Sequence, residues 1–304
     1  MSKPILVGHD PAGSDPAPVR FGVAAARFTG APLIVGSAHA DHAAIGHGHH
    51  SADTGLADDA TEQLDRIRAG LEADDVRAEY RALPGMSAPR ALHAAAEELD
   101  AGLLVVGHGA GHHHLHGSTA ERLLHGAPCP IAVVPSGWMP KGGVGIVGVA
   151  FTDTPEGQEA LRGAVALARR AGAKLRVLSA AKPHGFHETS AGTPAVQGMT
   201  YGEIGGELRV AAERAVAEAT AGVEGLDVEP DVSVQDPADF LIAASERLDL
   251  LVCGSRGYGP QRAVLLGGVS RRVTAEAACP VIVLERGAEA SLESLIVEPA
   301  TVAS

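Results

Sequence analysis

The chain has 304 residues, a formal net charge of −13 and three cysteines. Its length suits two domains of ordinary size, and 45% apolar but only 3% aromatic residues indicate cores of Ala, Val, Leu and Ile. The acidic balance excludes nucleic acid and anionic membranes as partners, because both need a basic surface. The first ten residues meet charge and proline too early for a signal peptide, and no apolar run approaches membrane length, so we expect a cytoplasmic protein.

The sequence contains an internal repeat. Residues 19–38 align without a gap on residues 161–180, and residues 127–134 match residues 277–284. A repeat of this length predicts two domains of one fold rather than a solenoid, whose periods are much shorter. The predicted organisation is a first domain at 1–135, a linker at 136–144, a second domain at 145–286 and a tail at 287–304.

Strands and helices alternate along the first copy, as short apolar runs separated by segments of helical periodicity. The predicted strands cover residues 5–9, 33–38, 76–83, 103–106 and 131–134. The predicted helices cover residues 17–30, 56–71, 88–99 and 118–125. A long polar loop is expected at 39–54, and a loop rich in glycine and histidine at 107–117.

The second copy repeats this order. Its predicted strands cover residues 145–151, 175–180, 228–235, 250–253 and 281–284. Its predicted helices cover residues 155–172, 206–221, 238–248 and 269–277. The alternation predicts an α/β fold of two tandem doubly wound domains, each with a parallel sheet and helices on both faces. The linker, rich in Pro and Gly, holds Trp138, which we expect to pack against a domain surface rather than to form a site.

A glycine-rich loop follows the fourth strand of the second copy. The strand ends at Gly254, Gly257 follows, and Gly267 with Gly268 opens the next helix. Glycines let a backbone approach a phosphate closely, and the N–H groups and dipole of a helix N-terminus attract the anion. The spacing is neither a Walker A motif nor Gly-x-Gly-x-x-Gly. Glycines that only turn tight corners would give the same pattern, so both interpretations stay open at this point.

The spacing Gly254-x2-Gly257-x9-Gly267, followed by Val269-Ser270 and the last strand, resembles the signature of the universal stress protein family in its tandem two-domain form. The resemblance implies a five-stranded sheet of order 3-2-1-4-5 in each domain. In the ATP-binding branch of that family, this loop holds the triphosphate and ribose. An acidic residue after the first strand and the backbone after the second strand complete that site, at the switch point of the sheet.

This resemblance implies that ATP or a related adenine nucleotide binds mainly in the second domain, in a non-enzymatic stress response. The residues carried over are Thr152, Ala180, Gly254, Gly257, Gly267, Gly268, Val269 and Ser270. Two of them depart from the family pattern: Gly268 stands where Ser or Thr is usual, and Thr152 stands at the acidic position. No nucleophile–base pair is evident, although slow ATP hydrolysis is not excluded.

The first copy shows the reverse pattern. Asp10 stands at the acidic position, but Ala110 replaces the second glycine of the loop, and three residues are missing before Gly117. A shortened loop without this glycine is not expected to wrap a triphosphate. Each copy therefore lacks something that the other retains.

All but two of the 15 histidines lie in the first copy, mostly in loops that follow its first, second and fourth strands. Histidine is the commonest metal ligand near neutral pH, and such tracts suit divalent transition metals. One hypothesis is a metal site with His9, Asp10, His39 and His108 as its inner set. Solvated loops of drifted composition and a pH-responsive rim are the alternatives, because no tight zinc spacing is present.

Several further expectations concern partners and single segments. The competing function is an interaction module with degenerate nucleotide sites and dimerisation through last-strand edges. The partners expected are an adenine nucleotide and an intramolecular domain pair, with a homodimer as an alternative. The loop at 181–203 is expected to be a lid or disordered.

Cys129, Cys253 and Cys279 are expected to be reduced core residues. A short amphipathic helix around 292–297 is assigned no role.

Overall fold

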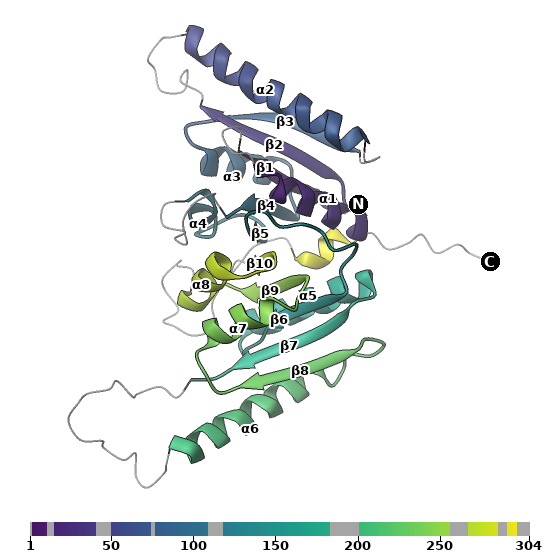
Figure 1. The fold of residues 1–304 in the computed structure, drawn as a ribbon, viewed down its shortest axis with the longest axis vertical. Coiled ribbons are helices and arrows are strands. Elements are labelled where there is room, and N and C mark those ends of the chain that lie inside the picture. Colours follow the sequence, from purple (N-terminus) through teal and green to yellow (C-terminus); the bar gives the residue numbers. More distant parts are fainter. Residues whose placement is uncertain are drawn as a thin grey trace, which may run out of the picture.

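The computed structural model describes residues 2–10, 15–40, 50–73, 77–108, 118–182, 201–255, 267–284 and 291–296. Within these residues the chain is an α/β protein in which the two copies lie side by side along one continuous sheet (Figure 1). The expectation of two tandem α/β domains is therefore confirmed.

The strands follow the predicted apolar runs closely. They are β1 (Ile5–His9), β2 (Leu33–Ala40), β3 (Ala78–Gly85), β4 (Leu103–Gly107), β5 (Ile131–Val134), β6 (Ile146–Ala150), β7 (Lys174–Ala180), β8 (Val228–Ser233), β9 (Leu250–Gly254) and β10 (Val281–Leu284). The central strands of each copy are almost wholly buried, as uninterrupted Val, Ile and Leu runs require of a parallel sheet with both faces covered.

The helices connect successive parallel strands. They are α1 (Ala17–Thr29), α2 (His50–Ala73), α3 (Ala88–Glu98), α4 (Thr119–Leu123), α5 (Pro155–Ala171), α6 (Tyr201–Thr220), α7 (Pro237–Ser245) and α8 (Gly268–Glu276). A 3₁₀ helix, η2 (Leu292–Leu295), lies in the C-terminal tail. Among the described residues, no helix combines the length and apolarity that a membrane span needs.

The strand order of the whole sheet is β3-β2-β1-β4-β5-β10-β9-β6-β7-β8. Each copy contributes five parallel strands in the order third, second, first, fourth, fifth. The copies join where β5 and β10 pair in antiparallel fashion, with Val133 opposite Val281 and Ala132 opposite Ile282. The edges of the two last strands are thus used within one chain. This pairing corrects the expectation of a homodimer through those edges.

The helices form one layer on each face of the sheet. On one face α1, α2, α5 and α6 enclose a core that runs through both copies, and on the other α3, α4, α7 and α8 enclose a second core. Cys129, Cys253 and Cys279 are buried and free, as expected. Burial raises the pKa of the Cys129 and Cys279 thiols to about 12.

Two helices begin earlier than their sequence patterns predict. Helix α2 starts at His50, inside the segment predicted as a polar loop, and α6 starts at Tyr201 rather than at Gly206. The Gly205–Gly206 pair argues against a helix on propensity, at about 1 kcal/mol per glycine. Helix α6 nevertheless runs through this pair, and its contacts with β7 and β8, including the buried Val216, stabilise it beyond its propensity.

The tail contributes to the junction between the copies. Leu292 and Leu295 of η2 are fully buried, and Leu292 packs so closely on α5 that a Cβ added at Gly163 would lie 2.9 Å from it. On the other side, Ser294 accepts a backbone hydrogen bond from Lys3 of the first copy at 3.0 Å. The tail therefore ties α5 of the second copy to the start of the first, a role that its sequence did not reveal.

We predict that Leu292→Ala lowers the free energy of unfolding by about 2–5 kcal/mol, the usual cost of emptying a buried leucine site. Urea denaturation followed by circular dichroism measures this change. The matched control is Val210→Ala, at a position that is 65% exposed on α6, which should change stability by less than about 0.5 kcal/mol. Equal stabilities of the Leu292 variant and the unmodified protein would contradict a packing role for the tail.

Candidate functional site

The carboxyl ends of three strands of the second copy meet at its switch point. Strand β6 lies between β7 and β9, and its register with both brings their ends to the same level. Thr152 follows β6, Ala180 ends β7 and Gly254 ends β9. An open α/β sheet offers its ligand crevice at this place, because the helices after adjacent strands leave toward opposite faces.

The ends of the glycine loop are closed by short hydrogen bonds. The N–H of Gly267 donates to the carbonyl of Ser255 at 2.8 Å, and the Ser270 hydroxyl donates to the carbonyl of Gly254 at 2.9 Å. Strand β9 and the start of α8 are therefore held side by side. Ser270 is buried, and its hydroxyl is engaged in fixing the loop rather than facing the crevice. Gly257 lies outside the described residues.

The N-terminus of α8 is open to an anion. Its N-cap residue Gly267 has no side chain to accept from the first N–H groups, and no acidic residue lies in the first turn. The N–H groups of Gly268, Val269 and Ser270 precede the first intrahelical bond, which Arg271 donates to Gly267. A Cβ added at Gly268 would meet nothing within 4 Å. These donors and the positive end of the helix dipole form a surface suited to phosphate.

The corresponding helix of the first copy provides its own cap. The Ser118 hydroxyl accepts a hydrogen bond from the N–H of Glu121 at 3.1 Å, and Glu121 adds a carboxylate to the first turn. Helix α4 also has only five residues. The positions that a phosphate would occupy are thus taken by the chain itself, which agrees with the divergence expected from the shortened loop.

No acidic residue directly follows β6 at the position expected from the first copy. A nearby acidic residue, Glu156, was not identified from the sequence spacing. Thr152 is half-buried, with its hydroxyl 3.4 Å from that of Thr154, which caps α5 by accepting from Gly157. Asp153 is exposed and accepts from Gln158. Glu156, in the first turn of α5, lies directly against Gly254: an added Cβ there would be 3.1 Å from the Cβ of Glu156.

Glu156 was missed because an alignment of the copies places the acid on the strand end, whereas Glu156 lies on the helix that follows. A search of the first helical turn beside the glycine loop would have found it. An acidic residue therefore still lies next to the glycine that ends β9 in the second copy.

The structure does not assemble the histidine-based metal site. Within the described residues, no three His, Cys, Asp or Glu side chains lie close enough to hold a metal ion, although His9, Asp10, His39 and His108 are all described. These residues lie at the ends of three neighbouring strands, β1, β2 and β4. The histidines at 42, 47, 49 and 112–116 lie outside the described residues.

Taken together, the two units define the class of doubly wound α/β proteins. The family model described as "Universal stress protein family" matches the chain twice, over residues 1–135 and 144–285. The chain belongs to this family, as its sequence motifs indicate.

Relatives agree with this assignment. A curated relative from Thermus aquaticus, "Universal stress protein in QAH/OAS sulfhydrylase 3'region", is 32% identical over 140 residues, which are 45% of this chain and 95% of the relative. Crystal structures of universal stress proteins resemble the whole chain. One from Archaeoglobus fulgidus has a TM-score of 0.66 at 19% identity, covering 94% of this chain and 97% of that one. A putative one from Pseudomonas aeruginosa has a TM-score of 0.65 at 15% identity, covering 97% and 95%.

We predict a pH dependence of stability that arises from His9. Burial lowers the pKa of His9 below its usual 6.5, and the nearby Asp10 offsets this only in part. Its Nε2 atom is buried without a hydrogen-bond partner among the described residues. Because the unfolded chain then binds the proton more readily, the cost to stability is absent above pH 6.5 and grows as the pH falls below it.

Urea denaturation midpoints of the unmodified protein and of His9→Gln, measured between pH 7.5 and 5.5, test this dependence. The other histidines are common to both proteins, so the difference isolates His9. We expect the unmodified protein to lose more stability on acidification than the variant. Parallel curves would contradict the lowered pKa.

Proposed function

We propose that this protein binds an adenine nucleotide, with ATP as the leading candidate, in the crevice of its second copy. The observation that carries the proposal is the uncapped N-terminus of α8 at the switch point, beside the close approach of Gly254. The contrast with the self-capped α4 of the first copy favours one functional site over two equivalent ones.

The proposed contacts follow from the chemistry of each position. The N–H groups of Gly268 and Val269 would bind phosphate oxygens, with Gly254, Gly257 and Gly267 allowing the backbone to approach. Ser270 would hold the loop through its bond to the Gly254 carbonyl.

The other end of the nucleotide would lie toward the neighbouring strands. The backbone at Ala180 would contact the base, and the Thr152 hydroxyl would take the place of the family's acid at the ribose, with Glu156 beside it. A hydroxyl is a weaker acceptor than a carboxylate, so the affinity of this site is expected to depend more on the phosphate end.

We propose a binding role rather than a catalytic one. In the described part of the crevice, the hydroxyls of Thr154 and Ser270 are engaged as a helix cap and a loop tie. The decisive experiment measures adenine nucleotide released by acid from protein purified without added nucleotide, together with calorimetric titration of MgATP. Absence of both retained nucleotide and binding at millimolar MgATP would overturn the proposal.

Substitutions at Gly268 test the position of the phosphate. The carboxylate of Gly268→Asp would occupy the first turn of α8 and repel a phosphate, whereas Gly268→Asn has nearly the same shape without the charge. We predict at least tenfold weaker MgATP binding for the Asp variant than for the Asn variant, about 1.4 kcal/mol. Calorimetric titration measures both.

Two controls accompany this pair. The thermal midpoint of Gly268→Asp should not fall, because a negative charge at a helix N-terminus stabilises the helix. Glu121→Gln, in the first turn of α4, should leave MgATP affinity unchanged, because that helix belongs to the first copy. Equal affinities of the two Gly268 variants would place the phosphate elsewhere.

A further inference from the structure

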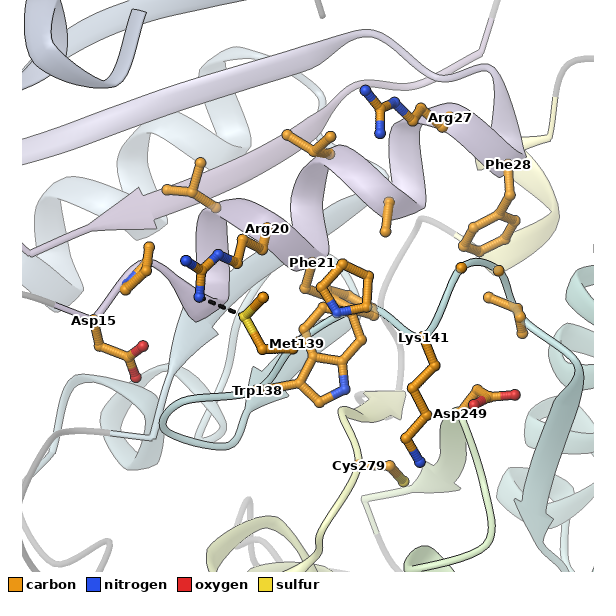
Figure 2. Close-up of a pocket in the computed structure, with 18 of the residues that line it drawn as sticks. Asp15, Arg20, Phe21, Arg27, Phe28, Trp138, Met139, Lys141, Asp249 and Cys279 are labelled. Atoms are coloured by element: carbon orange, nitrogen blue, oxygen red, sulfur yellow. Dashed lines mark hydrogen bonds between the residues drawn. The ribbon is translucent and has the colours of Figure 1, made fainter. Parts of the chain in front are cut away.

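A large cavity lies between the two copies, away from the nucleotide crevice. Its walls are helices α1 and α2 of the first copy, the linker at 138–144, and the segments just before β9 and β10 of the second copy (Figure 2). Its volume is about 910 Å³, which lies within the range of roughly 300–1,000 Å³ found for small-molecule sites. Neither copy alone could form it.

The linker wall is fixed in place at both ends. The Asp15 carboxylate accepts a hydrogen bond from the N–H of Gly137 at 3.1 Å. The Asp249 carboxylate accepts from the N–H groups of Gly145 and Ile146 at 2.8 and 2.9 Å. The cavity is therefore largely pre-formed, which reduces the ordering cost of binding.

The interior is mainly apolar and aromatic. Trp138 stacks edge-on against Phe21 of α1, with ring centroids 5.6 Å apart at an interplanar angle of 76°. Phe28 lies two turns further along the same helix, and Val23 lies on the same wall. Trp138 thus packs against a domain surface as expected, but it also lines a cavity, which the sequence did not suggest.

Cations surround this apolar interior. Arg20 and Arg27 extend from α1, and Lys141 extends from the linker across the cavity (Figure 2). The Arg20 guanidinium donates to the Met139 sulfur at 2.8 Å, a weak acceptor for a charged donor. Lys141 points toward Asp249 and Cys279 but forms no ion pair within the described part of the chain.

Two acids also line the cavity, fewer than the three cations. Both Asp15 and Asp249 are engaged with the backbone N–H groups that hold the linker ends. The charged lining residues are Arg20, Arg27 and Lys141 against Asp15 and Asp249, a formal balance of +1, although the whole chain carries −13. A positive formal charge beside apolar walls in an acidic protein favours a negatively charged ligand group.

The cavity is distinct from the proposed nucleotide site. Asp249 precedes β9 and lines the cavity, whereas Gly254 ends β9 and borders the crevice. A strand rises about 3.3 Å per residue, so the length of β9 separates the two places by roughly 15 Å. The family model also leaves residues 136–143 unmatched between its two segments, and these include most of the linker wall.

We propose that this cavity binds a small organic anion with an apolar body, of the carboxylate class, with its charged group at Arg20 and Lys141 and its apolar part against Trp138 and Phe21. The cations alone would also attract inorganic anions. The aromatic walls offer an inorganic ion no favourable contact. They do bury the apolar chain or ring of an organic carboxylate.

Trp138 is the only tryptophan of the chain and reports directly on the cavity. We would titrate the full-length protein with octanoate and record Trp138 emission, with 1-octanol as the neutral ligand of equal chain length. The expected result is a saturable change for both, with octanoate binding at least tenfold more tightly. No saturable change with octanoate, or equal affinities for the two ligands, would overturn the proposal.

Three variants locate the ligand. Arg20→Gln and Lys141→Gln should each weaken octanoate at least threefold and leave 1-octanol unchanged, while Ala24→Phe, which fills the cavity from α1, should weaken both. Arg170→Gln, an exposed cation on α5, is the matched control and should change neither. Urea midpoints confirm that each variant is folded. Octanoate binding that is indifferent to Arg20 and Lys141 would contradict the proposed site.

Saturating MgATP separates this proposal from the nucleotide site. Octanoate affinity should be unchanged in its presence, because the two places lie at opposite ends of β9. Displacement of octanoate by MgATP, with no effect of the Lys141 variant, would assign the fluorescence change to the nucleotide crevice and overturn the cavity proposal. If the protein does not bind nucleotide, the octanoate titration still tests the cavity proposal.

Discussion

The antiparallel pairing of β5 with β10 determines the architecture of the whole molecule. Each strand is a run of four buried apolar residues, and together they convert two five-stranded sheets into one sheet of ten strands. The pairing removes an aggregation-prone edge from each copy. It also places α1 and α5 on the same face, so that one hydrophobic core continues across the junction. The relative position of the two copies is thus determined by the sheet, and the linker and the tail pack against this junction.

The two copies keep the same scaffold but differ at one helix N-terminus. In the first copy, Ser118 and Glu121 satisfy the first turn of α4 with the chain's own oxygens. In the second, Gly267 leaves the first turn of α8 to an external acceptor. A self-capped helix gains about 1 kcal/mol of local stability, whereas an uncapped one leaves its first N–H groups without an acceptor from its own cap residue.

Much of the fold could be predicted because buried parallel strands appear in the sequence as short apolar runs, as at 103–107 and 281–284. Helix starts were less predictable, since α6 begins at Tyr201 and runs through Gly205 and Gly206 against their propensity. In the crevice, the motif located Gly254 and Gly267 but not Glu156, which approaches from another helix. The Ser270 hydroxyl donates to the carbonyl of Gly254, and the spacing of residues in the motif does not predict this hydrogen bond.

The cavity between the copies was the least predictable feature, for a physical reason. Its walls come from segments that carry no motif: helices α1 and α2, a linker, and residues that precede two strands. Its charge arises because Arg20, Arg27 and Lys141 outnumber Asp15 and Asp249 on these segments. Such a site requires both copies in one chain, with β5 paired to β10. A single copy would not contain this cavity, so its formation depends on the tandem arrangement.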